Sequence, residues 1–351
     1  MQIALAKEGL YDNKENIPSN SVVDGGKDND AQWRKPSVTL VQLTPKEVKQ
    51  RTGFRDLKHL LAYSAVVYAG RLDEMAKTVT KMTWLEELLF FYEFSWGRSN
   101  VRMQDYEREY DCVYNTLMKA VQYRLRWELD CRVRWPMFAS CEEDAEFRAP
   151  SWNQHFDPVN GHRPVMHDTT NIPLPSPSSG DLNRALHNKY YNMCCAKAGV
   201  AVQLCCWIFG LPLVTGHSDD DRQIEDTKIL ELQKEFSEND STSHRPFLNV
   251  FDKGYHQLLQ AMRHGQMCCR PDDADEHFGG DKVLRSGCVA VVRSGNERGV
   301  NRCKMSWFIK RGCSDQTWDI GLLCNVWEAF SFRINFMYDN FQQSILEELI
   351  D

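Results

Sequence analysis

The sequence predicts a mixed α/β protein in which an all-α domain precedes a domain of strands and helices. Helix-start signals and helically spaced apolar residues dominate residues 39–136, whereas short apolar runs bounded by Pro and Gly follow from residue 137. The chain has 351 residues, 42% of them hydrophobic, and is long enough for two or three domains with a sizeable core. We expect four parts: a disordered polar tail over residues 1–38, the helical domain over residues 39–136, the α/β domain over residues 137–343, and an acidic end over residues 344–351.

Composition excludes several classes of protein. The formal net charge of −7 argues against a protein that coats nucleic acid without specificity, although it is compatible with a local basic surface. No apolar run approaches the roughly 20 residues that a membrane helix needs, so we expect no membrane partner. The Cys residues include adjacent pairs that cannot easily form ordinary disulfides, and no signal peptide is visible. A reducing compartment, the cytosol or the nucleus, is therefore expected.

Two capping boxes predict where helices begin in the first domain. Thr44 and Thr83 each stand three residues before a Glu, and a Pro occupies the first helical position after Thr44. The helix that follows Thr83 is expected to end before Gly97. Apolar residues at helical spacing predict further helices over Phe54–Tyr68 and Tyr106–Trp127.

Short helices separated by turns are compatible with a helix-turn-helix-like module that binds DNA. Six arginines could then give this domain a basic face for phosphates: Arg98, Arg102, Arg124, Arg126, Arg132 and Arg134. A plain helical bundle with a solvated charged face fits the same residues, so both interpretations stay open.

Strand-like runs characterise the second domain. Val165–Thr170 is predicted to form a short strand that ends in an acid, and a Pro-rich spacer follows it. Phe247–Phe251, a buried apolar run, predicts a later strand. Between them we expect a meander and then an amphipathic helix, over Lys189–Cys195, Gly199–Phe209, Leu213–Gly216 and Gln223–Phe236. Further helices are expected over His256–Gly265, Asn296–Arg311 and Trp327–Phe341, with a short strand over Val289–Arg293.

Asp252 directly follows the predicted strand Phe247–Phe251. A carboxylate held at the end of a buried strand needs a partner for its charge, and a metal ion is one such partner. Alternatively, Asp252 caps the helix expected over His256–Gly265. This stretch alone leaves both interpretations open.

Three acids occupy comparable places along the chain. Asp168 ends the first strand, Asp252 follows a later strand, and Glu297 lies on a helix after it. Acids at these places in the order strand, meander, helix, strand, helices are the pattern of a ribonuclease-H-like nuclease core. Two divalent ions about 4 Å apart, held by shared carboxylates, can activate water or a 3′-hydroxyl for in-line phosphoryl displacement. Hard oxygen ligands suit Mg²⁺ or Mn²⁺.

The helix expected over Asn296–Arg311 is basic apart from Glu297, which is therefore either a salt-bridge partner or a metal ligand. Its basic residues either hold DNA phosphates or form a solvated face: Arg298, Arg302, Lys304, Lys310 and Arg311.

Other residues offer weaker alternatives. Glu328 could replace Glu297, but its aromatic neighbours favour a core helix. Three loop acids could replace Asp168, although a solvated turn explains them better: Asp219, Asp220 and Asp221. The adjacent Cys pairs lack C-x-x-C spacing, which favours buried thiols over zinc ligands with His256, His264 and His277. Nucleotide hydrolysis and serine hydrolysis have no support, since the chain has no Gly-rich phosphate loop and no G-x-S-x-G.

From roughly Leu43 to Asn340 the chain resembles the DDE-superfamily endonucleases of Harbinger-type and related insertion-sequence-like DNA transposons, which are transposable elements. The matching pieces follow one another along the chain. They are Leu43-Thr44, Thr52-Gly53-Phe54, Thr83–Glu87, Trp135-Pro136, His167–Thr170, Tyr190–Asn192, Ala196–Val200, Gln203–Trp207, Asp252–Tyr255 and Asn296–Arg298.

This resemblance implies a transposase whose catalytic acids are Asp168, Asp252 and Glu297, with Asp168 bridging two Mg²⁺ or Mn²⁺ ions. It implies a metal-dependent DNA endonuclease and strand transferase that cuts DNA by in-line phosphoryl transfer in the nucleus, with a helical DNA-binding domain and a homo-oligomeric state. No Cys/His zinc finger or strongly basic tail begins the sequence, so end recognition is expected from the helical domain or from an accessory DNA-binding partner protein. The alternative is a domesticated, transposase-derived DNA-binding or scaffold protein without nuclease activity.

Overall fold

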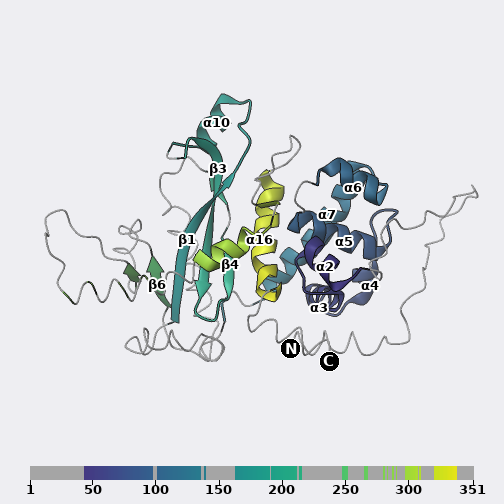
Figure 1. Ribbon diagram of the computed structural model, residues 1–351, viewed down its shortest axis with the longest axis horizontal. Coiled ribbons are helices and arrows are strands. Elements are labelled where there is room, and N and C mark those ends of the chain that lie inside the picture. The colour runs from purple at the N-terminus through teal and green to yellow at the C-terminus, as the bar shows by residue number, and fades with distance from the viewer. Residues whose placement is uncertain are drawn as a thin grey trace, which may run out of the picture. The chain divides into compact units, whose positions relative to one another are not determined.

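The computed structural model describes residues 43–97, 101–135, 138–139, 163–189, 191–211, 213–215, 247–251, 265–267, 280, 283, 287, 290, 297–306, 308–309 and 320–337. The chain divides into two compact units, Met1–Cys131 with Ser344–Asp351, and Arg132–Gln343. Figure 1 shows helices in the first unit and both helices and a sheet in the second, which confirms the predicted mixed α/β class. None of the described helices is long and apolar enough to cross a membrane.

The described elements of the first unit are all helices. They are α2 (Pro45–Thr52), α3 (Leu57–Val67), α4 (Leu72–Ala76), α5 (Trp84–Trp96), α6 (Met103–Tyr110) and α7 (Tyr114–Arg134), the last of which contains the division between Cys131 and Arg132. Helix α5 forms the core of the unit, because every residue from Glu86 to Ser95 is buried. Its Tyr92 ring packs edge-on against Phe54, with the ring centroids 5.3 Å apart.

Both predicted capping boxes are confirmed. The Thr44 hydroxyl accepts from the Glu47 N–H, and the Glu47 carboxylate accepts from the Thr44 N–H at 2.8 Å. Thr83 and Glu86 make the same two bonds at the start of α5, which ends at Trp96 as expected. These starts were predictable because each is built from side chains only three residues apart.

The single helix predicted over Tyr106–Trp127 is wrong. Asp111 adopts a left-handed conformation with φ of 46° and ends α6, and α7 starts at Tyr114. The Tyr114 N–H donates to the Glu107 carboxylate at 2.6 Å, which satisfies a backbone group at the start of α7. Asp tolerates the left-handed region better than most residues, so a helix can end here without the Gly or Pro that would make the break visible in the sequence.

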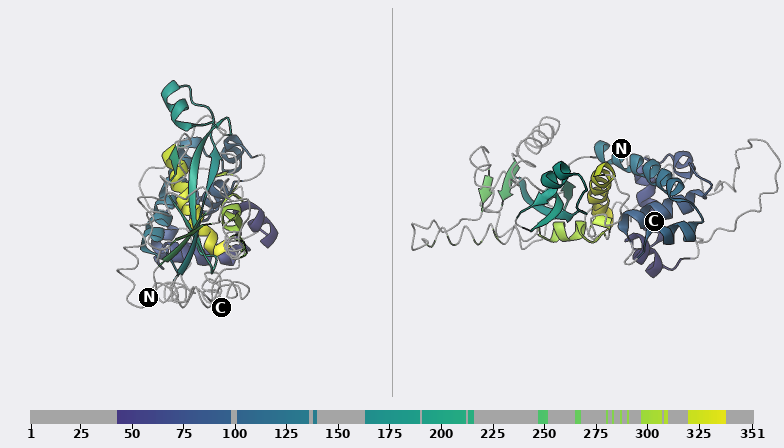
Figure 2. Two further views of the ribbon diagram at one scale, coloured as in Figure 1. Left: turned by 90° about the vertical axis from the view of Figure 1, so that its left-hand side faces the viewer. Right: turned by 90° about the horizontal axis from the view of Figure 1, so that it is seen from above.

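The second unit is built on a mixed sheet. Its strands are β1 (Arg163–Pro173), β2 (His187–Asn188), β3 (Met193–Gln203), β4 (Ile208–Gly210), β5 (Val214–Thr215), β6 (Phe247–Phe251) and β7 (Gly265–Met267). The order is β2-β3-β1-β6-β7, with β4 and β5 also paired to β3. Strand β1 is central, antiparallel to β3 and parallel to β6, which is parallel to β7. Helix α10 (Gly180–Leu186) follows β1 in the chain, and Figure 2 shows it at one end of the long strands β1 and β3.

Strand β6 has the bounds that the sequence predicted, but the meander differs. The prediction of two separate strands over Lys189–Cys195 and Gly199–Phe209 is wrong, because β3 is continuous from Met193 to Gln203. The chain then turns through Cys206, whose φ is 67°, before β4 begins. Strand β3 is buried over nearly all its length, so its sequence lacks the polar residues that usually mark the ends of a strand.

Other predicted elements also change. Gly265 lies in β7 rather than in a helix, and Ala290 is helical rather than part of a strand. The final helix, α16, spans Ile320–Met337 and starts earlier than predicted. The amphipathic helix predicted over Gln223–Phe236 lies outside the described residues.

Helix α16 packs against β4, beside which it stands in Figure 1. Gly210 permits this close approach, since a Cβ there would lie 2.2 Å from the Ser331 hydroxyl oxygen. The Trp327 indole N–H donates to the Leu211 carbonyl at 2.8 Å. On the other side of the sheet a core cluster forms from Phe138, Val165, Ala201, Leu211 and Phe247.

Candidate active site

Asp168 lies within β1, five residues before the strand ends at Pro173. The prediction that it ends the strand is therefore wrong. Its side chain is half-buried, and its Oδ1 accepts from the Thr169 N–H at 2.8 Å. Asp168 is directly opposite Val200 on β3, just as Met166 is opposite Val202, so all four side chains share one face of the sheet.

The helical residues 297–303 cover this same face. A Cβ on Gly299 would lie 2.7 Å from Val202 Cγ2 and 3.7 Å from Ile208 Cδ1, which shows how closely the helix approaches the sheet. Gly299, Val300 and Cys303 are buried, whereas Glu297 is exposed. The structure thus brings the helix that carries Glu297 onto the face that carries Asp168.

Lys304, which follows this helix, is an electrostatic neighbour of Asp168. Burial lowers the pKa of the half-buried Lys304 amine, and the Asp168 carboxylate acts against that shift. The sequence had suggested that Lys304 either holds a DNA phosphate or lies on a solvated face. The pairing was not visible, because Asp168 and Lys304 are far apart in the chain and meet through the packing of Gly299 on β3.

The remaining predicted site residues are placed as follows. Arg298 is exposed and Arg302 is half-buried. Asp252, Lys310 and Arg311 lie outside the described residues. Within the part of the chain that the structure describes, no three His, Cys, Asp or Glu side chains are grouped so as to hold a metal ion.

On the opposite face, His167 of β1 meets Asn249 of β6. His167 Nε2 and Asn249 Oδ1 are 2.7 Å apart, and the imidazole stacks on the Phe251 ring with centroids 4.8 Å apart. Burial lowers the pKa of His167 to about 4, against the opposing effect of the bond to Asn249. Sequence reasoning missed this pair, although a lone Asn in an apolar strand is a signal for a buried hydrogen bond.

Two of the arginines proposed as a phosphate-binding face have other partners. Arg124 is 1% exposed and donates to the Glu87 carboxylate and to the Met75 and Lys77 carbonyls. The Arg132 side chain is 11% exposed and pairs with Glu328 at 2.9 Å. Assigning these two to a basic face is therefore wrong, while Arg102, Arg126 and Arg134 are exposed and Arg98 lies outside the described residues.

The burial of α3 argues against a helix-turn-helix that contacts DNA through this helix. The turn between α2 and α3 is short and contains Gly53 with φ of 81°, as such motifs often do. However, eight of the 11 residues of α3 are buried, so this helix has little surface to present to a DNA groove. Among the described helices, α3 is therefore a poor candidate for contact with a DNA groove.

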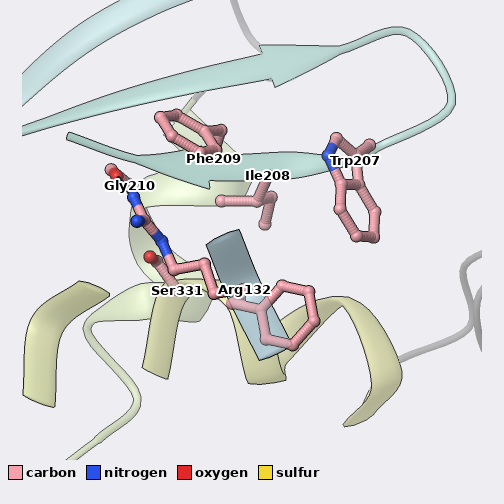
Figure 3. Close-up of a pocket in the computed structure, with 7 residues that line it drawn as sticks. Arg132, Trp207, Ile208, Phe209, Gly210 and Ser331 are labelled. Atoms are coloured by element: carbon pink, nitrogen blue, oxygen red, sulfur yellow. Dashed lines mark hydrogen bonds between the residues drawn. The ribbon is translucent and has the colours of Figure 1, made fainter. Parts of the chain in front are cut away.

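A pocket on the second unit offers no separate site (Figure 3). It is lined by Arg132, Trp207, Ile208, Phe209, Gly210, Ser331 and Phe332. The Arg132 guanidinium lies 4.6 Å from the centroid of the Phe209 ring and donates to the Gly210 carbonyl at 2.8 Å. Glu328, the alternative third acid, forms an ion pair with Arg132 and is therefore part of the packing around this pocket.

The alternative of zinc ligation gains no geometric support among the described residues. Cys194, Cys195 and Cys205 are buried thiols. Burial raises the pKa of Cys195, which disfavours the thiolate that zinc requires. His256, His264, His277 and the loop acids Asp219, Asp220 and Asp221 lie outside the described residues.

No protein-family model, no curated protein and no solved structure matches the chain.

Proposed function

We propose that the chain is a metal-dependent DNA endonuclease and strand transferase of the DDE transposase type. The observation that carries the proposal is the register of β1 and β6. Met166 and Val250 are partners on these parallel neighbours. Asp168 comes two residues after Met166, and Asp252 comes two residues after Val250.

This register argues for a shared site. Side chains two residues apart on a strand point to the same face, and neighbouring strands are about 4.8 Å apart. In the proposal Asp252 acts together with Asp168 as a metal ligand. Two neighbouring carboxylates repel each other unless a cation lies between them.

Glu297 and the sheet order add independent support. Residues 297–303 pack on the face that carries Asp168, through Gly299 against Val202. A central strand with an antiparallel meander on one side and parallel strands on the other agrees with the order expected of a ribonuclease-H-like core. Asp168, Asp252 and Glu297 are the proposed catalytic and metal-binding acids.

The donor set fits the proposed ions. Carboxylate oxygens are hard ligands of the kind Mg²⁺ and Mn²⁺ prefer, and Asp168 is half-buried rather than sealed in the core. When bound, two such ions supply an activated water or 3′-hydroxyl and stabilise the leaving oxygen. The Thr169 N–H orients the Asp168 carboxylate, and Arg298 and Arg302 on the neighbouring helix contact DNA phosphates. DNA, an accessory DNA-binding partner, a homo-oligomeric state and action in the nucleus belong to this proposal.

One observation favours a second function, that of a transposase-derived DNA-binding or scaffold protein without nuclease activity. The Lys304 ammonium is close enough to Asp168 for their charges to interact. A resident cation beside an acid can satisfy the charge that a metal ion would otherwise satisfy. Under this second function, neither the wild type nor Lys304→Met nicks DNA, and both proteins bind DNA.

Nicking of supercoiled plasmid in Mn²⁺ tests the leading function. Asp168→Asn and Glu297→Gln keep side-chain size and remove the charges that hold metal, so both should abolish nicking. Asp181→Asn is the matched control, because Asp181 is exposed on α10 and pairs only at the surface with Arg184. Equal nicking by all four proteins would refute the proposal.

A further inference from the structure

We propose that the His167–Asn249 pair fixes the register of β1 against β6, and thereby positions Asp168, the acid that follows His167 on β1. The first part concerns the fold alone, whereas the role of Asp168 as a metal ligand rests on the proposed function. His167 and Asn249 are therefore positioning residues, on the face of the sheet opposite to Asp168.

The contact is short and fully enclosed. His167 is 0% exposed and Asn249 is 3% exposed. Because an amide oxygen can only accept, the His167 Nε2–H donates to Asn249 Oδ1, across 2.7 Å. The ring also stacks on Phe251 at an interplanar angle of 22°, and Phe251 lies two residues beyond Asn249 on the same face.

The apolar pattern of β6 does not specify its register. The strand reads Phe-Leu-Asn-Val-Phe and all five residues are buried, so both of its faces are apolar except at Asn249. A strand that is polar on one face loses its buried apolar contacts when it slips by one residue. A slip of β6 would only exchange one buried, mostly apolar face for the other. Asn249 is thus the one polar residue of β6, and its hydrogen bond to His167 distinguishes one register from another.

A slip would leave polar groups without their bond. Moving β6 by one residue turns Asn249 to the face of Met166 and Val202, away from His167. Two buried polar groups would then lose their common hydrogen bond, which is strongly unfavourable in an apolar interior. Register selection by a buried polar pair is a well-supported use of such groups.

The register bears on the position of Asp168. Asp168 follows His167 directly, so anchoring the imidazole on one face directs the Asp168 side chain to the other. A slip of one residue would displace β6 by about 3.3 Å along β1 and reverse the faces of its side chains. The pair thereby acts on the proposed site without touching it.

A cross-link reports the register without any need for activity. Met166→Cys with Val250→Cys places thiols on partner residues, at the Cα separation of neighbouring strands, which suits a disulfide. Oxidation of the full chain and peptide mapping by mass spectrometry measure the yield of this bond, distinct from those of the native thiols. The yield is compared with and without the further pair His167→Phe and Asn249→Leu, which removes both polar partners and leaves neither unsatisfied.

We expect the ratio of cross-linked to uncross-linked chain to fall about tenfold when the polar pair is absent, which corresponds to a register preference of ~1.4 kcal/mol. An unchanged yield would overturn the proposal. Should the cysteines prevent folding, exchange of the amides of residues 247–251 with deuterium replaces the cross-link: faster exchange in the His167→Phe and Asn249→Leu protein supports the proposal, and equal exchange refutes it.

Mn²⁺ binding by calorimetry then separates the two proposals. Weaker Mn²⁺ binding by the His167→Phe and Asn249→Leu protein, together with a reduced cross-link, supports both. If the wild type binds no Mn²⁺ while the cross-link still depends on the polar pair, the register role stands and the nuclease proposal fails. If Mn²⁺ binds equally well to both proteins and the cross-link is unchanged, the register role fails while the nuclease proposal stands.

Discussion

The carboxamide of Asn335 on α16 is hydrogen-bonded to both backbone groups of Ile208 on β4. Asn335 Oδ1 accepts from the Ile208 N–H and Nδ2 donates to the Ile208 carbonyl, each at 2.8 Å. A side chain thus makes the two bonds that a neighbouring strand would make. The pair attaches α16 to β4, and β4 contacts the helix that carries Glu297 through Ile208.

Asn335→Leu should destabilise the second unit by roughly 2–4 kcal/mol, because it leaves two buried backbone groups of Ile208 unsatisfied. Asn325→Leu is the matched control on the exposed side of α16 and should change stability by less than about 0.5 kcal/mol. Urea unfolding followed by tryptophan fluorescence measures both, and equal midpoints for the two variants would refute the role of Asn335.

In the first unit, Arg124→Met should destabilise by about 3–5 kcal/mol, since it leaves the buried Glu87 charge without its cation. The Met75 and Lys77 carbonyls also lose their donor. Arg126→Met, two residues along α7 and exposed, should be nearly neutral. Unfolding followed by far-ultraviolet circular dichroism tests this, and a neutral Arg124→Met would show that the ion pair is dispensable.

His167 should make stability depend on pH. Its pKa is about 4 in the folded chain, below the ordinary 6.5, so the unfolded chain binds a proton in this interval that the folded chain does not. The contribution is complete above pH 6.5 and is lost as the pH falls toward 4, to a total of about 3 kcal/mol. Stability curves of the wild type and His167→Gln should therefore converge as the pH falls across this range. Curves that stay parallel would contradict the assignment.

Gly299→Ala should push residues 297–303 away from β3, because the new Cβ would lie 2.7 Å from Val202 Cγ2. Under the proposed function nicking should fall by roughly 10- to 100-fold, the scale of a displacement near 1 Å at a reacting centre. Val202→Ala removes the clashing atom, so the double variant should recover activity. Gly287→Ala, with nothing within 4 Å of its Cβ, is the control. Failure of Val202→Ala to rescue would show that the contact does not position Glu297.

Local signals allowed part of the fold to be predicted. The capping boxes at Thr44 and Thr83 involve only neighbouring residues, and β6 is a short apolar run with clear flanks, so the sequence located all three. The break at Asp111 and the turn at Cys206 depend on left-handed residues that are not glycine, and both were missed. Helix α10, capped by Ser179, was hidden by the prolines before it.

The candidate site was predictable only in its residue types. A strand-like run suggested Asp168 and an otherwise basic helix suggested Glu297 as candidates, and the structure brings the helix of Glu297 to the face of Asp168. The approach of Lys304 to Asp168 and the bond between His167 and Asn249 arise from packing between distant segments, which a single sequence does not encode locally. The same reason explains why Arg124, polar in the sequence, is buried beside Glu87.

Nicking of supercoiled plasmid in Mn²⁺ by the wild type and by Asp252→Asn tests the proposed nuclease function. The substitution keeps the size of the side chain and removes the charge proposed to hold metal beside Asp168. We expect the wild type to nick the plasmid and Asp252→Asn not to do so. Equal nicking by the two proteins would rule out Asp252 as a catalytic residue, because the cleaving site would then lie elsewhere.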